Sequence, residues 1–375
     1  MTEKFDLGRN GEQIPVTNQG LGVGSWCSMM YHYTVVDHDG KFKACTECIG
    51  ENASQKEVQF NSYKELREST WLASAKEEMA NGIWPKSCSQ CQGKEANNIK
   101  SMRQNHNEEH LVHKLIREDY LKVELITDNL CNGACQMCHS LASTRIGALY
   151  DKRNYPLVDN RSKFDTLPID RITRLDIIGG EPSYSSIAKG ILKNVPTGVV
   201  AMKIATNGSK SLVPYIEPLL QRGIKIRITL SFDGVGPVYD YVRWPVKYEK
   251  VVLRILEYIE FGKKYPDNFA LRLTLTVSTL NVNDMINIYS FADKHNLLSS
   301  FCLVSWPPEL DPRFSNTVTR RAKEALKESS NPFVLAISNL IAVKEDNQEK
   351  FEQFVQEQDK LRNIKVEDYV PTLLT

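Results

Sequence analysis

Six short apolar runs between residues 120 and 308 constrain the fold of this chain more than any other feature. Each run is rich in Val, Ile, Leu or Thr, and helix-like segments separate each run from the next. The runs are YLKVELITDN, ITRLDIIGGEP, VVAMKIATNG, KIRITLSFDG, ALRLTLTVS and SSFCLVSWPP. Strands that alternate with helices predict a parallel sheet, either an open doubly wound sheet or a partial (β/α)6 barrel.

Polar and glycine-containing segments directly follow the first four of these runs. They are NLCNGACQMC, GGEP, TNG and SFDG. In both kinds of α/β fold, chemistry takes place at the carboxyl ends of the strands. We therefore expect these four segments to meet at one site.

Composition and charge exclude several classes of protein. The chain has 375 residues, which favours two or three domains, and its 41% hydrophobic and 25% charged content is that of a globular protein. A formal net charge of +1 argues against general nucleic-acid binding and against membrane-surface binding by bulk electrostatics. The first fifteen residues have no apolar signal-peptide core, and no apolar run is long enough to span a membrane. We expect a cytoplasmic protein.

Eight of the nine cysteines lie within the first 138 residues. They are Cys27, Cys45, Cys48, Cys88, Cys91, Cys131, Cys135 and Cys138. Because disulfides are rare in the cytoplasm, this clustering indicates bound metal. The ninth, Cys302, lies in an apolar strand-like run, where a small buried hydrophobic residue is the simplest interpretation.

Cys131, Cys135 and Cys138 form a C-x3-C-x2-C run. Thiolates are soft ligands that suit zinc or iron–sulfur clusters. Structural zinc takes four ligands, whereas three thiolates on a four-iron cluster leave one iron open to another ligand. A Cys3His zinc knuckle with His139 as fourth ligand, or unligated thiols, are the alternatives that this run leaves open.

The GGEP segment places Gly179, Gly180 and Glu181 at the end of the next expected strand. The two glycines let the backbone approach a ligand closely, and Glu181 offers a carboxylate to an ammonium group. A tight turn would also explain the tripeptide by itself. The order of the two motifs, a three-cysteine loop after one strand and GGEP after the next, is a rarer combination.

At these motifs the sequence resembles the radical S-adenosylmethionine (SAM) superfamily, over roughly residues 120–305. The resemblance implies a [4Fe–4S] cluster on Cys131, Cys135 and Cys138, whose open iron binds the amino and carboxylate groups of SAM. GGEP resembles the motif that holds the methionyl amino group. An electron from the cluster would then cleave SAM to methionine and a 5′-deoxyadenosyl radical, which takes a hydrogen atom from a substrate.

The same resemblance suggests further contacts. It implies that Met137 packs on adenine, that Asn207 lies near the SAM ribose or carboxylate, and that Ser231 binds a ribose hydroxyl. It also places Asp233 as a polar group in the cavity, and Arg243 matches an arginine often found shortly after the fourth-strand motif. Ordinary turns at the Asn-Gly and Asp-Gly pairs, and a surface position for Arg243, are the alternatives.

The other cysteines form a second set, Cys27, Cys45, Cys88 and Cys91, with Cys48 as a fifth member. Their spacing suits either a zinc site or a second cluster. The segments WCSMMYHYTVVDHDGKFKAC and PKSCSQCQGKE resemble the twitch domain, a shortened relative of the SPASM domain. The resemblance implies an auxiliary [4Fe–4S] cluster for electron transfer or substrate binding. Because one cysteine is displaced from the usual spacing, either Cys45 or Cys48 can be the ligand, and we choose Cys45.

We therefore expect a twitch- or SPASM-like module over 1–118, a radical SAM core forming a partial (β/α)6 barrel over 119–312, and a helical extension over 313–375. The predicted function is a radical SAM oxidoreductase acting on a peptide or small polar metabolite, with a flavodoxin- or ferredoxin-type reductant. Dehydrogenation, epimerisation and bond formation all remain open outcomes. Asp233 and Cys302 are the candidate catalytic residues. The alternatives are a non-catalytic, zinc-stabilised binding protein and an electron carrier with two clusters.

Overall fold

The computed structural model describes residues 24–48, 58–96, 100–114, 119–151, 156–304, 306–341, 344–371 and 373–374. The expectation for the first fifteen residues lies outside these ranges. Within them, no helix combines the length and the apolar character needed to cross a membrane.

The described residues form a mixed α/β fold around one eight-stranded sheet of order β2-β1-β3-β4-β5-β6-β7-β8. The strands are β1 (Tyr33–Val36), β2 (Phe42–Lys43), β3 (Leu121–Ile126), β4 (Ile172–Ile178), β5 (Ala201–Thr206), β6 (Lys225–Ser231), β7 (Phe269–Val277) and β8 (Leu298–Leu303). Only β2 runs antiparallel to its neighbour. Strands β3 to β8 are the six expected ones, and this confirms the predicted parallel α/β core.

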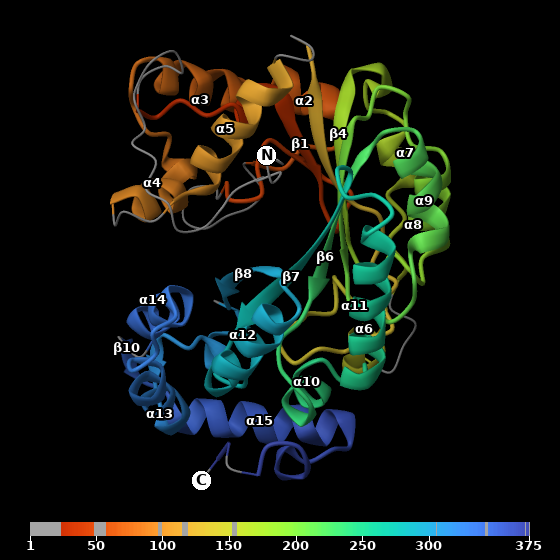
Figure 1. Ribbon diagram of the computed structural model, residues 1–375. Helices are drawn as coiled ribbons and strands as arrows, with labels where there is room; N and C mark the ends of the chain where they lie inside the picture. Colours follow the sequence, from red (N-terminus) through yellow and green to blue (C-terminus); the bar gives the residue numbers. More distant parts are fainter. Residues whose placement is uncertain are drawn as a thin grey trace.

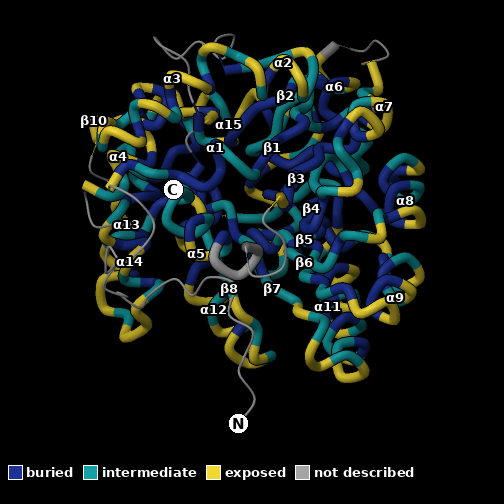
Figure 2. The backbone as a smooth tube through the Cα atoms, turned by 90° about the horizontal axis from the view of Figure 1, so that it is seen from above, coloured by how far each residue is buried: buried dark blue, intermediate teal, exposed yellow. Residues whose placement is uncertain are grey.

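Helices that follow the strands cover one face of the curved sheet (Figure 1). They include α6 (Thr144–Asp151), α7 (Arg161–Phe164), α8 (Ser186–Lys193), α9 (Val213–Gln221), α10 (Pro237–Val242), α11 (Tyr248–Gly262) and α12 (Met285–Lys294). Along α11 the buried residues Val251, Ile255 and Tyr258 recur every three or four positions, which is the stripe of an amphipathic helix. Figure 2 shows the outer sides of α8, α9 and α11 exposed and much of the sheet buried. In β5 and β6 buried and half-buried residues alternate, so every second side chain faces the side of the sheet without these helices.

The N-terminal segment extends this sheet. The sequence over 25–50 predicts a hairpin, with a strand at MMYHYTVV and a turn at DHDG. The strand begins only at Tyr33, because residues 29–32 form the short helix α1 (Met29–His32). The predicted DHDG turn is present, since the Gly40 N–H donates to the Asp37 carbonyl at 2.9 Å. Strand β1 pairs in parallel with β3, so the hairpin adds two strands to the edge of the core sheet.

The sequence pattern over 61–81 predicts a single helix, but the structure contains two, α2 (Tyr63–Glu68) and α3 (Thr70–Ala80). Ser69 separates them, because its extended backbone ends α2 while its hydroxyl accepts the Leu72 N–H at 3.2 Å and caps α3. Two more helices of this segment follow, α4 (Ser89–Ala96) and α5 (Met102–Lys114).

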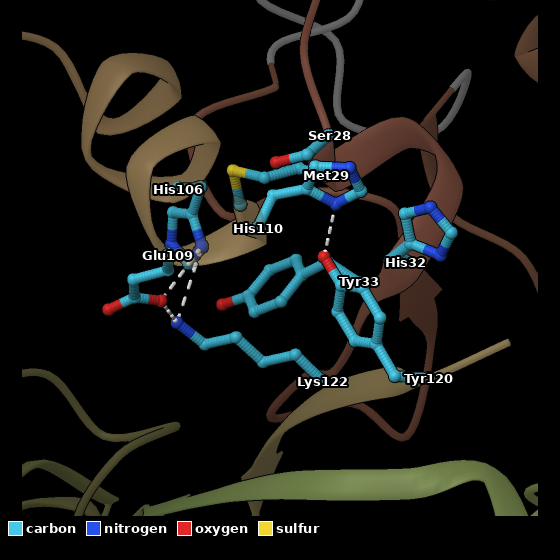
Figure 3. Close-up of a pocket in the computed structure, with 9 residues that line it drawn as sticks. All are labelled: Ser28, Met29, His32, Tyr33, His106, Glu109, His110, Tyr120 and Lys122. Atoms are coloured by element: carbon cyan, nitrogen blue, oxygen red, sulfur yellow. Dashed lines mark hydrogen bonds and ion pairs between the residues drawn. The ribbon is translucent and has the colours of Figure 1, made fainter. Parts of the chain in front are cut away.

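Buried ion pairs fasten α5 to the core strands. Glu109 lies 2.6 Å from Lys122 of β3 and 3.0 Å from Arg174 of β4. Burial alone would raise the pKa of Glu109, but these two cations lower it to about 2. Figure 3 shows Lys122 reaching Glu109 and His106, beside a hydrogen-bonded pair of His110 and Tyr120. This polar contact joins the N-terminal segment to the sheet.

The C-terminal region packs against the 3-10 helices that follow β7 and β8, and against α6 and α12. It contains β9 (Phe314–Ser315), α13 (Thr317–Leu326), α14 (Pro332–Leu340), β10 (Lys344–Asp346) and α15 (Gln348–Arg362). Short 3-10 helices cover Lys86–Cys88, Ile169–Arg171, Val282–Asp284, Pro308–Leu310 and Val366–Asp368. Helix α15 contacts α6 and runs along the edge of the molecule where α6 and α10 lie (Figure 1).

Candidate functional site

A cavity of about 330 Å³ opens at the carboxyl ends of the core strands. Most of the residues expected at the site line it: Cys131, Cys135, Met137, Cys138, Gly179, Gly180, Asn207, Ser231 and Arg243. They follow or end strands β3, β4, β5 and β6, as expected for a parallel sheet. The wall also contains Thr206 and Thr276, which the motifs did not single out, and His139.

The cysteine loop closes around Gly133. A Cβ atom added there would lie 3.5 Å from the Cys135 sulfur and 3.6 Å from the Cys131 sulfur, so the glycine leaves open the space between two thiols. The Gly133 N–H donates to Cys131 Sγ at 3.3 Å. Burial and the neighbouring Cys135 thiol raise the pKa of Cys131, and the same two causes raise the pKa of Cys138 to about 12. A site of this kind needs a bound cation to hold its thiols as thiolates.

The GGEP backbone packs against the chain that leads into the cysteine loop. The Gly180 N–H donates to the Asp128 carbonyl at 2.9 Å, and the Glu181 N–H donates to the Leu130 carbonyl at 2.8 Å. A Cβ at Gly180 would lie 2.2 Å from the Leu130 oxygen, and Gly179 has φ +135°. The two glycines therefore let the GGEP loop lie close to the chain that leads into the cysteine loop.

Glu181 is 1% exposed and does not line the cavity. Its carboxylate accepts hydrogen bonds from Ser183 N–H at 3.0 Å, Thr206 O–H at 2.6 Å and Asn207 N–H at 2.6 Å. Burial raises its pKa, and these bonds act in the opposite sense. In this structure Glu181 joins the second-strand motif to the third-strand motif, and its contact with a SAM amino group stays a prediction.

Asn207 links the third strand to the cysteine loop. Its Nδ2 donates to Asn132 Oδ1 at 2.9 Å, and its Oδ1 accepts the Ser209 N–H at 2.9 Å. The turn expected as an alternative is present, since Gly208 has φ +74°. Asn207 precedes this turn and also lines the cavity, and its contact with SAM stays a prediction.

Asp233 holds Arg243 in place. Arg243 Nε donates to Asp233 Oδ2 at 2.6 Å, and Arg243 Nη1 lies 3.5 Å from the Cys135 sulfur. Asp233 is fully buried, and its Oδ1 accepts the Thr276 N–H at 2.7 Å. Burial raises the pKa of Asp233 and the charge on Arg243 opposes this. Arg243 faces the cavity, whereas Asp233 lies behind it.

The interpretation of Cys302 as a buried hydrophobic residue is wrong, because Cys302 is exposed. Strand β8 is the last strand of the open sheet, so its side chains receive less cover than those of central strands. The Cys302 sulfur lies 4.0 Å from the hydroxyl of Thr276, which lines the cavity. The thiol is therefore a neighbour of the site without being part of its wall.

The remaining cysteines converge on a second pocket, lined by Cys27, Cys45, Cys48, Cys88 and Cys91. The Glu47 N–H donates to Cys45 Sγ at 3.3 Å, the same local pattern as at Cys131. Hydrogen bonds to Cys45 and Cys88 raise the pKa of the Cys48 thiol, so Cys48 belongs to the group as fully as Cys45 does.

The donors of both pockets are soft thiols, which is the chemistry that iron–sulfur clusters require. Among the side chains of the described residues, no group of three or more His, Cys, Asp or Glu is arranged to hold a single metal ion. The three-thiol loop, with its glycine and the adjoining cavity, fits a cluster that also binds a further ligand.

No family model and no curated protein matches the sequence. A search of solved structures finds several that this chain resembles at low sequence identity. Among them are Streptococcus suis SuiB bound to S-adenosylmethionine, anSMEcpe with bound AdoMet, and the radical SAM methyltransferase TsrM from Kitasatospora setae with cobalamin and a [4Fe–4S] cluster.

The alignment to SuiB has 13% identity and a TM-score of 0.37, and it covers 77% of this chain and 62% of SuiB. The alignment to anSMEcpe has 15% identity and a TM-score of 0.38, and it covers 64% of this chain and 62% of anSMEcpe. The alignment to TsrM has 11% identity and a TM-score of 0.36, and it covers 49% of this chain and 37% of TsrM. This chain thus spans less than two thirds of these proteins, and we base the function on its own residues.

Proposed function

We propose that this chain is a radical SAM enzyme that cleaves SAM reductively and uses the resulting 5′-deoxyadenosyl radical to remove hydrogen from a substrate. One observation carries the proposal: three cysteines, the Gly-Gly backbone, Asn207, Ser231 and Arg243, from four strand ends, share one cavity. A tight turn or a surface arginine would explain any one of these features, but not their convergence.

Most of the expected wall residues have a role in this proposal. Cys131, Cys135 and Cys138 would hold a [4Fe–4S] cluster, which supplies the electron that splits the sulfonium of SAM. The Gly179–Gly180 backbone would receive the methionyl group, and Glu181 joins this motif to the third-strand motif through its hydrogen bonds with Thr206 and Asn207. Asn207 and Ser231 would bind the carboxylate and ribose, and Met137 would contact adenine.

The second thiol group would hold an auxiliary [4Fe–4S] cluster. Five cysteines in one pocket suffice for complete thiolate ligation, which favours electron transfer to or from the substrate over direct substrate binding. With the exposed Cys302 thiol beside the cavity, this supports an oxidoreductase outcome, including epimerisation. The proposal includes a peptide or small polar substrate, a flavodoxin- or ferredoxin-type reductant, a cytoplasmic location, and the division at 118 and 312.

Metal content and SAM cleavage test the proposal together. Protein purified without oxygen should be brown, contain about eight irons per chain, and release 5′-deoxyadenosine when given SAM and a strong reductant. Replacing Cys135 by Ala should abolish the release and leave about four irons at the auxiliary site.

Two results would replace the proposal by its alternatives. Colourless protein with stoichiometric zinc would indicate the binding protein. Two intact clusters that neither bind nor cleave SAM would indicate the electron carrier.

A further inference from the structure

One side chain of the C-terminal helix reaches the backbone of the cysteine loop. Arg362, the last residue of α15, is 4% exposed. Its Nε donates to the Ala134 carbonyl at 3.0 Å, and its Nη2 donates to the Cys135 carbonyl at 3.4 Å. The helical extension therefore contacts the backbone of one proposed cluster ligand, Cys135, and of the residue before it.

The same loop is also hydrogen-bonded to the C-terminal end of α10 and the residues that follow it. The Ala134 N–H donates to the Trp244 carbonyl at 2.8 Å, and the Gln136 N–H donates to the Val242 carbonyl at 2.9 Å. Arg362 donates instead to the carbonyl groups of Ala134 and Cys135. Buried carbonyl groups need such partners, so Arg362 completes the hydrogen bonding of a loop that belongs to no strand.

The guanidinium of Arg362 is itself fixed. Its Nη1 donates to the Gln358 side-chain oxygen at 2.5 Å and to the Gln358 carbonyl at 3.3 Å. Gln358 Nε2 donates to the Tyr150 hydroxyl of α6 at 2.9 Å, and Asp359 accepts the Tyr241 hydroxyl at 2.8 Å. Because α15 is anchored to two core helices, Arg362 meets the loop with little freedom to move.

The position of Arg362 also matters for charge. Arg243 approaches Cys135 at its sulfur, and Arg362 approaches it at its carbonyl. A buried cation stabilises added negative charge nearby because screening by water is weak there.

We propose that Arg362 is a positioning residue for the SAM-binding cluster: it holds the cysteine loop from the C-terminal helix and raises the reduction potential of the cluster on that loop. This inference rests on the proposed function. It assigns a role to the segment that follows the core, for which the sequence predicted only a helical extension.

The test compares Arg362→Gln with Lys360→Gln in full-length, anaerobically reconstituted protein. Both changes remove one positive charge from the end of α15, but Lys360 is exposed. An EPR-monitored redox titration follows the cluster signal that responds to SAM. For Arg362→Gln we expect the ratio of reduced to oxidised cluster at a fixed potential to fall about tenfold, which corresponds to 59 mV for one electron. Lys360→Gln should titrate like the wild type.

Hydrogen exchange of the loop peptide is a second measurement that does not depend on cluster loading. In Arg362→Gln the amides of residues 131–138 should exchange at least tenfold faster than in Lys360→Gln. Arg362→Lys should restore part of the potential but little of the protection, because an ammonium group lacks the planar fork that reaches two carbonyl groups.

The possible failures are distinguishable. A SAM-responsive cluster whose potential is the same in Arg362→Gln and wild type, with unchanged exchange, overturns this inference alone. A wild-type protein without any SAM-responsive cluster contradicts the proposed function and this inference together.

Discussion

Arg243 donates a hydrogen bond of 2.6 Å to Asp233, and the same guanidinium lies 3.5 Å from the sulfur of Cys135. Asp233 also accepts the Thr276 N–H, so the carboxylate joins β7 to the arginine. Through this pair the fourth-strand motif reaches the cysteine loop. Asp233 thus acts on the site through Arg243 and does not touch the cavity itself.

Replacing Asp233 by Asn should lower the rate of 5′-deoxyadenosine release by about 10–100-fold, the usual cost of losing a residue that orients a metal ligand or its neighbour. The reason is that Arg243 loses its charged partner while the cysteines stay intact. Iron content should remain that of the wild type. Asp293→Asn, an exposed carboxylate on α12, is the control and should leave the rate unchanged. A wild-type rate in Asp233→Asn would contradict this role.

Gly180→Ala should disrupt the site through packing alone. The new Cβ would lie 2.2 Å from the Leu130 oxygen, so the two loops must move apart, and overpacking of this kind costs about 1–3 kcal/mol. We expect a lower urea midpoint and weaker iron loading of the three-cysteine loop. Gly93→Ala is the matched control, since a Cβ there meets nothing within 4 Å and α4 should gain about 0.5–1 kcal/mol. Equal midpoints for both variants would show that the loops tolerate separation.

Asp284 should make stability depend on pH. Burial raises its pKa to about 6, against the hydrogen bonds from Val235 N–H and the Asn287 side chain. A raised pKa favours the protonated form in the folded protein, so this contribution is complete below about pH 4 and is lost as pH rises through 6.

At pH 8 the Asp284→Asn variant should therefore have a free energy of unfolding up to roughly 2–3 kcal/mol higher than the wild type, and a higher urea midpoint. At pH 4 this difference should be absent. Asn keeps an oxygen that can accept the Val235 N–H. The measurement is a pair of urea titrations at the two pH values. A constant difference between the proteins at both pH values would mean that Asp284 does not titrate in this range.

Cys45 and Cys48 should substitute for each other at the auxiliary site. Both line the five-thiol pocket, and four thiolates complete a [4Fe–4S] cluster. Cys45→Ser and Cys48→Ser should each keep about eight irons per chain, whereas the double variant should keep about four. Loss of the auxiliary cluster in only one of the two single variants would identify that cysteine as the sole ligand.

The sequence predicted the core strands because each one lies in a run rich in Val, Ile, Leu or Thr, and several of these runs stop at a Gly, Asn, Asp or Pro. It predicted the wrong start for β1, since MMYH carries the same apolar pattern as a strand but forms a helical turn. It also gave no sign that β1 would pair with β3, because such pairing depends on contacts between distant segments. The convergence of the cysteines followed from their number and spacing.

Contacts made across long sequence distances could not be predicted. Arg362 lies in a highly charged segment, whose sequence indicates a solvent-exposed helix. Only folding brings its side chain to the Ala134 carbonyl. Glu181 was expected to face a ligand, but Thr206 and Asn207 donate to its carboxylate from the next strand. A single sequence shows which side chains can bind, while the partners that each finds depend on how the strands are ordered.

The most direct test of the central claim is whether SAM binds to the cluster on Cys131, Cys135 and Cys138. Pulsed electron–nuclear double resonance on the reduced protein, with SAM labelled at its amino nitrogen and carboxylate oxygens, measures this contact. The account predicts hyperfine coupling from both groups in the wild type and none in Cys135→Ala. A wild-type cluster that shows neither coupling, or a loop that contains a single zinc ion, would contradict it.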